Sequence, residues 1–189
     1  MNRRLFLAMA IVPLLTVSKA RADGVTVRWD IIHLTSPSGT PTIDPGGHAS
    51  ATAEDSSKIT FTGSGTFQLG DDGEATGGGT WTTSAPAASG TYVVTGLIKF
   101  DVAPGSLQSF IVDHIGNAHA GLAFLRIRYS DGSRGVLVVS CHLAVGGSDA
   151  VFEGVTASKG YVDYWNHEVA VMGVDADRTH ISITASGDD

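Results

Sequence analysis

Histidine and carboxylate side chains come closest together in the segment that runs from Asp113 to His119. Asp113, His114 and His119 offer oxygen and nitrogen donors, the ligand types that suit zinc or copper. His119 follows His114 by five positions, so on an uninterrupted strand the two side chains would face opposite sides. A loop through Gly116 and Asn117 would have to bring them together, and the spacing matches no known metal motif. We therefore predict no metal and no other cofactor. The three residues are kept as metal-ligand candidates, with loop histidines bonded to backbone as the alternative.

Cys141 is the only cysteine of the chain, and His142 follows it directly. Adjacent residues on a strand point to opposite faces, so this pair does not bring the imidazole within hydrogen-bond reach of the thiol, as a nucleophilic pair requires. Cys141 shares its face with Leu137, Val139 and Leu143. We predict a buried, inert thiol, and a single cysteine also excludes an intramolecular disulfide.

Aromatic and hydrogen-bonding side chains are densest from Tyr161 to Glu168. Tryptophan and tyrosine beside the mouth of a barrel often line a ligand pocket. The alternative is that these side chains fill the core. The candidate ligand-binding residues are Tyr161, Asp163, Tyr164, Trp165, Trp81 and Glu153. Catalytic residues remain unassigned.

Strands must position these side chains, because hydrophobic residues recur at every second position through much of the chain. The clearest case is residues 121–129, where Ala123, Leu125 and Ile127 alternate with bulkier or charged neighbours. Residues 136–143 return as the partner strand after a polar turn, which predicts a hairpin.

Glycine is the second structural signal, with 24 residues in the chain. In residues 63–81 it stands at repeated strand positions, which favours bulges and strong curvature. No amphipathic helix pattern follows the first 22 residues. We predict an all-β fold of about eight to ten strands, forming a single antiparallel β-barrel, with a β-sandwich as the alternative.

Residues 1–22 have the three parts of an export signal peptide. Arg3 and Arg4 precede an apolar run over residues 5–17, and residues 20–22 (Ala-Arg-Ala) supply a cleavage site. The run is shorter than the roughly 20 residues that a membrane span needs. The paired arginines before Leu5 resemble the twin-arginine export signature, and an ordinary secretory signal is the alternative. We predict an exported protein, periplasmic or extracellular, whose residues 23–189 form a single β domain.

The charge balance limits the partners of the domain. Residues 1–22 carry four of the 12 basic side chains and none of the 19 acidic ones, so residues 23–189 hold 8 basic and 19 acidic side chains, a formal charge of −11. Such a charge repels phosphate backbones and anionic membrane surfaces. We therefore predict no nucleic-acid partner and no stable membrane insertion after signal removal. A small-molecule ligand and a homo-oligomer remain open.

Three segments carry a resemblance to known proteins: residues 77–81 (GGGTW), 141–143 (CHL) and 152–166 (FEGVTASKGYVDYWN). Together they resemble a group of exported, glycine-rich bacterial β proteins with no assigned activity. The glycine-punctuated strands are more distantly similar to the β-barrel of allene oxide cyclases and dirigent proteins. No catalytic residue of those barrels matches a position here, and fold analogy alone does not supply a function.

Three functions follow as hypotheses. The first is an exported β-barrel that binds a small apolar or amphipathic ligand. The second is an enzyme of the cyclase or dirigent type, in which a carboxylate such as Glu153 or Asp163 assists a reactive intermediate. The third is a structural, envelope-associated protein without a pocket.

Overall fold

The computed structural model describes residues 24–36, 39–69 and 74–184, and these residues form strands, turns and loops but no helix. The all-β prediction is therefore confirmed. The predicted signal peptide at residues 1–22 lies outside the described residues. Within the described part of the chain, no helix has the length and hydrophobicity that crossing a bilayer requires.

The described residues form fourteen strands, compared with the eight to ten that the sequence predicts. The additional strands are short, and two to four residues are too few to display a two-residue period. The strands are β1 (Val25–Thr35), β2 (Thr42–Pro45), β3 (Ala49–Thr52), β4 (Lys58–Phe61), β5 (Ser64–Leu69), β6 (Ala75–Ser84), β7 (Ala87–Val102), β8 (Val112–Asp113), β9 (Gly121–Tyr129), β10 (Arg134–Cys141), β11 (Gly154–Lys159), β12 (Val162–Tyr164), β13 (Asn166–His167) and β14 (Thr179–Thr184).

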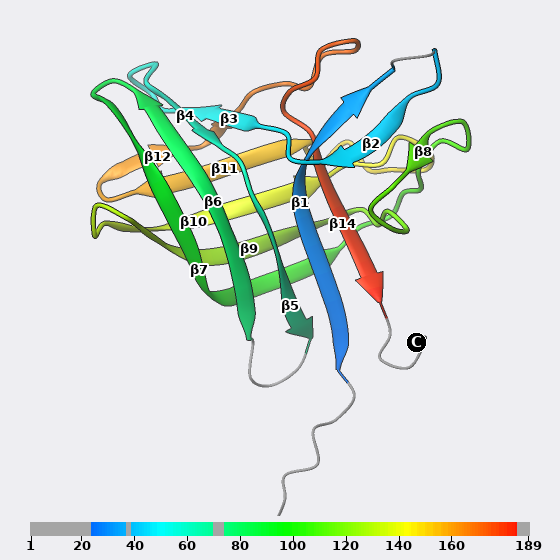
Figure 1. Ribbon diagram of the computed structural model, residues 1–189, viewed down its shortest axis with the longest axis horizontal. Helices are drawn as coiled ribbons and strands as arrows, with labels where there is room; N and C mark the ends of the chain where they lie inside the picture. Colours follow the sequence, from blue (N-terminus) through cyan, green and yellow to red (C-terminus); the bar gives the residue numbers. More distant parts are fainter. Residues whose placement is uncertain (1–23, 37–38, 70–73, 185–189) are drawn as a thin grey trace, which may run out of the picture.

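The strands lie in two layers that cross at a steep angle (Figure 1). β6, β5, β1 and β14 form the front layer in this view, and β9, β10 and β11 run behind them. Hydrogen bonds connect the layers into one sheet in the order β12-β11-β10-β9-β7-β6-β5-β1-β2-β8. β14 pairs with β1, while β4 pairs with β6 and leads to β3 and β13.

β7 joins the layers because it is long and bent. It pairs with β6 through its first half and with β9 through most of its length. Its ladder with β9 shifts register between Val94 and Gly96 and again between Leu97 and Lys99. Bulges of this kind increase the local twist and bend a strand. The first of the two shifts ends at Gly96.

The structure does not confirm the predicted single antiparallel barrel. β2 and β8 pair in parallel, so the sheet is mixed. Within the described residues no ladder joins the two ends of the strand order, so the sheet is not closed. The sheet also branches: β6 pairs with β5, β4 and β7, and β1 pairs with β14, β5 and β2. Hydrophobic alternation reports which face of a strand is buried, but it does not determine which neighbours the strand pairs with.

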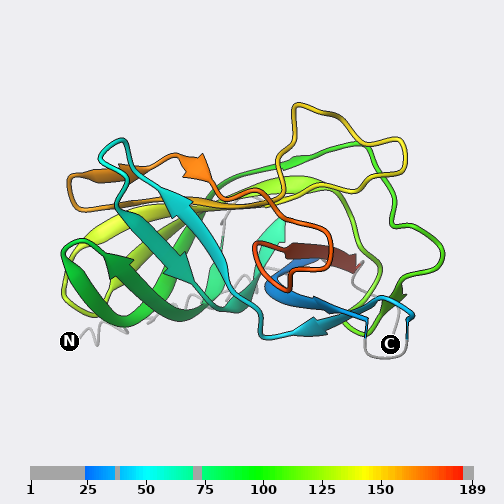
Figure 2. The ribbon, with the colours of Figure 1, turned by 90° about the horizontal axis from the view of Figure 1, so that it is seen from above.

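The core lies between the two layers (Figure 2) and is rich in aromatic side chains. The Phe61 and Tyr92 rings meet edge to face with centroids 5.4 Å apart, and Trp81 and Tyr129 meet in the same way at 5.6 Å. Each polar atom of these rings is satisfied: Tyr92 Oη donates to the Thr62 carbonyl at 2.9 Å, and Trp81 Nε1 donates to the Thr91 carbonyl at 3.1 Å. This part of the interior is filled by protein side chains.

Candidate functional site

Of the predicted ligand-binding residues, Trp81 and Tyr164 belong to the core. Their exposed fractions are 2% and 3%. Trp81 packs on Tyr129, and Lys159 Nζ lies 4.4 Å from the centroid of the Trp81 ring, which covers the core at this end. The alternative interpretation, in which these aromatics fill the interior, applies to both residues.

Glu153 lies at a junction between strands. Its Oε2 accepts a hydrogen bond from the His142 backbone N–H and its Oε1 accepts one from the Thr179 backbone N–H, each at 2.7 Å. Burial raises the pKa of Glu153 to about 7, although these N–H groups and the charge of Arg178 act in the opposite direction. Both oxygens are committed to the backbone, so Glu153 ties the start of β14 to the end of β10.

Tyr161, Asp163 and Trp165 are exposed, at the free edge of the back layer. Tyr161 stands in the turn between β11 and β12 and is fully exposed, and Trp165 is 56% exposed. Asp163 lies opposite Ser158, one position away from the buried pair Ala157 and Tyr164, so its side chain faces outward. We call Tyr161, Val162 and Trp165 the aromatic edge.

The three metal-ligand candidates have separate partners. His114 Nδ1 lies 2.8 Å from Asp44 Oδ1, and His119 Nδ1 lies 2.9 Å from the Asn117 carbonyl oxygen. Asp113 is directed instead to His180. In residues 24–36, 39–69 and 74–184, no group of three or more His, Cys, Asp or Glu side chains is placed to hold a metal ion.

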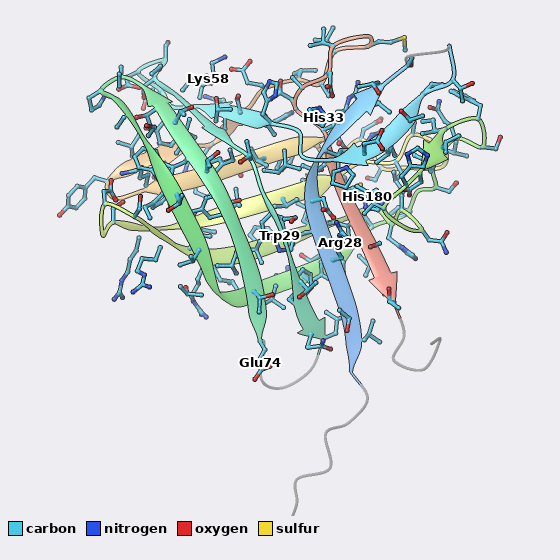
Figure 3. All side chains as sticks on the ribbon, viewed as in Figure 1. Arg28, Trp29, His33, Lys58, Glu74 and His180 are labelled. Atoms are coloured by element: carbon cyan, nitrogen blue, oxygen red, sulfur yellow. The ribbon has the colours of Figure 1, made fainter. Side chains whose placement is uncertain are left out.

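His180 is a buried hydrogen-bond partner of Asp113 that the sequence analysis did not identify. It is 1% exposed, and its Nε2 lies 2.9 Å from Asp113 Oδ2 and 3.1 Å from the Gly116 carbonyl oxygen. Both neighbours are acceptors, so Nε2 carries the hydrogen. Figure 3 shows His180 on β14, below His33 at the upper end of β1. Burial acts to raise the pKa of Asp113, but the backbone N–H of Ile115 and the imidazole of His180 hold that pKa below its ordinary value. The pair fastens the segment after β8 against β14.

Cys141 is buried, and burial raises the pKa of its thiol well above the ordinary value. A neutral thiol is a weak nucleophile. His142 donates its backbone N–H to Glu153 and, as the residue after the strand, does not complete a nucleophilic pair.

Three arginines on the outer face of the back layer were not predicted as site residues. Arg126 and Arg128 on β9 and Arg134 on β10 are all exposed. The residues that alternate with the two β9 arginines, Leu125, Ile127 and Tyr129, are buried. The signal was present in the sequence, since the two β9 arginines occupy the outward positions of an alternating strand.

No family model, curated protein or solved structure matches this chain.

Proposed function

We propose that this protein is an exported binding module that holds a small apolar or amphipathic ligand at its aromatic edge. The observation that carries the proposal is the exposure of Tyr161, Val162 and Trp165 at one end of the sheet. The other two aromatic candidates, Trp81 and Tyr164, are buried. Exposed aromatic side chains that do not serve the core are typical of contact surfaces.

The ligand site belongs on the surface because the part of the interior around Trp81 is occupied. Phe61, Tyr92 and Tyr129 meet there ring to ring, and Lys159 lies over the end of the cluster. A ligand inside this region would have to displace closely packed aromatic side chains.

The cyclase or dirigent-like alternative has less support. A general acid or base must reach the proton that it transfers. Glu153 has a suitable pKa, but both of its oxygens accept backbone hydrogen bonds. Asp163 is on the outer face and has no neighbouring imidazole or thiol among its strand partners.

We also propose that the fold is a β-sandwich and that the protein is exported. The two crossed layers around one core favour the sandwich alternative over a closed barrel. The signal-peptide pattern of residues 1–22 favours export to the periplasm or beyond. The glycine-rich exported β proteins remain the proposed relatives.

Intrinsic fluorescence tests the binding proposal, because Trp165 is exposed and the other two tryptophans, Trp29 and Trp81, are buried. We expect dodecyl maltoside, titrated into residues 23–189 below its micelle concentration, to shift the emission to shorter wavelength. Trp165→Phe should remove that shift, and Tyr161→Ser should weaken binding at least fivefold.

Met172→Ser is the matched control, since Met172 is 95% exposed and lies on a different loop. Equal binding by the wild type, Tyr161→Ser and Trp165→Phe in calorimetry would overturn the proposal. So would the absence of any binding by the wild type.

A further inference from the structure

The outer face of β9 and β10 carries three arginines at one end. Arg128 lies directly opposite Arg134 in the antiparallel ladder, and Arg126 is two positions from Arg128 on the same face. Side chains directly opposite each other in such a ladder are about 5 Å apart at their Cβ atoms. Three guanidinium groups therefore share one small surface, which we call the arginine face.

The arginine face differs from the other basic residues of the domain because, within the described residues, none of its arginines forms an ion pair with a carboxylate. Four of the other basic side chains form ion pairs with carboxylates: Arg28 with Asp30, Lys58 with Glu168, Lys99 with Asp101 and Lys159 with Asp131. The positive charge of the fifth, Arg178, acts to lower the pKa of Glu153. Arg126, Arg128 and Arg134 have no carboxylate within 4.0 Å in the part of the chain that the structure describes.

This absence is notable in a domain with more than twice as many acidic as basic side chains. Like charges placed directly opposite on a sheet destabilise it. The fold does not require charge at these positions, because the side chains point to solvent. A ligand with negative charge would convert the repulsion into an attraction, and arginine binds carboxylate, phosphate and sulfate groups through paired N–H donors.

Aliphatic surface surrounds the arginine face. Val93 lies opposite Arg128 on β7 and is 45% exposed, and Ile98, also 45% exposed, stands at the second register shift of the same strand. Gly96 lies opposite Arg126, and a Cβ at this position would lie 3.6 Å from Arg126 Nη1. The missing side chain leaves room for the guanidinium to lie along β7.

The arginine face continues into the aromatic edge. The Gly160 backbone N–H donates to the Arg134 carbonyl oxygen at 3.1 Å, and Tyr161 is the next residue. The β9–β10 turn and the β11–β12 turn lie at the same end of the molecule, where Lys159 pairs with Asp131 (Figures 1 and 2). Two carboxylates of the outer face lie farther away. Asp163 is separated from Arg126 by the positions of Val136 and Ser158, and Asp101, opposite Leu122, is paired with Lys99.

We infer that the arginine face binds the anionic headgroup of the ligand, and that the ligand is a monomeric, single-chain amphiphile with a carboxylate, phosphate or sulfate group. This inference rests on the proposed function, since the hydrocarbon chain would lie toward the aromatic edge. A dissolved amphiphile is favoured over an anionic bilayer, because the formal charge of −11 on residues 23–189 repels an extended anionic surface.

Calorimetry with three probes of equal chain length tests the inference. Dodecanoate, dodecyl maltoside and dodecyltrimethylammonium supply a negative, a neutral and a positive head. We expect the wild type to bind dodecanoate at least tenfold more tightly than the maltoside, and the ammonium probe most weakly. Arg128→Ser combined with Arg134→Ser should abolish that preference and leave maltoside binding within twofold. Arg128→Lys combined with Arg134→Lys should keep part of the preference for dodecanoate over the maltoside.

Lys58→Ser is the matched control, because it removes one exposed positive charge from β4, away from the arginine face. The double serine variant should melt no lower than the wild type, since it removes a like-charge pair. Unchanged dodecanoate preference in a folded double variant would overturn the inference and leave the proposed function in place. At least fivefold weaker binding of all three probes by Tyr161→Ser, with the order of probe affinities unchanged, supports the proposed function independently of the arginine face. Tighter binding to vesicles of anionic phospholipid than to dodecanoate would also overturn the inference.

Discussion

Glu153 Oε1 accepts a 2.7 Å hydrogen bond from the backbone N–H of Thr179, the first residue of β14. Thr179 Oγ1 in turn donates to the Ser140 carbonyl oxygen at 2.6 Å. The C-terminal strand is therefore attached at its start to β10 of the other layer, through one carboxylate and one hydroxyl. This contact and other details of the fold give three predictions, and the N-terminal sequence gives a fourth.

The Glu153 contact predicts a particular pH dependence of stability. The pKa of Glu153 is about 7 in the folded chain and about 4.5 in an unfolded one, so the folded state binds the extra proton. Its contribution to stability is fully present below pH 4.5 and is lost as the pH rises through about 7. Urea unfolding of wild type and Glu153→Gln from pH 4 to pH 8 should show this fall only in the wild type.

Glu54→Gln, at an exposed position, is the control for that measurement. Glu153→Ala should cost about 1–3 kcal/mol at every pH, because two backbone N–H groups lose their acceptors. A wild type and a Glu153→Gln variant with parallel pH profiles would show that Glu153 is not the titrating group.

Gly135 predicts a steric limit in the hairpin. A Cβ at this position would stand 1.8 Å from the Ser158 carbonyl oxygen, which is backbone and cannot move aside without breaking the β10–β11 pairing. Gly135→Ala should therefore cost about 3 kcal/mol in the free energy of unfolding. Gly96→Ala meets only Arg126 Nη1 at 3.6 Å and should change stability by about 0.5 kcal/mol or less. Similar losses in both variants would contradict the close approach.

Asp113 predicts a local effect on the segment that follows β8. Its Oδ1 accepts hydrogen bonds from the backbone N–H groups of Ile115 and Gly116, and its Oδ2 accepts one from His180. Asp113→Ala should accelerate amide hydrogen exchange at Ile115 and Gly116 and cost about 1–3 kcal/mol. His114→Ala removes only a half-exposed pair with Asp44 and should leave the two amides protected. Protection that persists in Asp113→Ala would show that other contacts hold this segment.

The paired arginines at the N-terminus predict the export route. Replacement of Arg3 and Arg4 by lysine in the full chain should leave the precursor uncleaved inside a bacterial host, because the twin-arginine route reads the arginine pair. A host strain without that transporter should give the same result with the wild type. Cleaved, exported protein from both experiments would assign the chain to the ordinary secretory route.

Much of the fold could be predicted from periodicity. The alternation in residues 121–129 predicted the strand that forms β9, and the return over residues 136–143 predicted most of β10 at residues 134–141. The same alternation predicted that Cys141 is buried, which the structure confirms. Burial on one face is a property of each strand by itself, so a single sequence carries it.

The roles of the candidate site residues, in contrast, depend mainly on the tertiary structure. Tyr164 and Trp165 are adjacent aromatics of similar hydrophobicity, and only the pairing of Tyr164 with Ala157 decides which of them enters the core. The role of Glu153 depends on Thr179, which approaches from the far end of the chain. His180 and Asp113 meet only because β14 and the segment after β8 are packed together.

The sequence by itself determined that the domain is made of strands, which side chains of the long strands are buried, and that acidic groups outnumber basic ones. The tertiary structure decided that the sheet branches and remains open in the described residues, that the aromatics around Trp81 fill the interior, and that three arginines share one face. The physical reason is the separation along the chain over which each interaction acts. Alternation arises between neighbours in the chain, whereas strand pairing is a competition among distant segments for the same backbone hydrogen bonds.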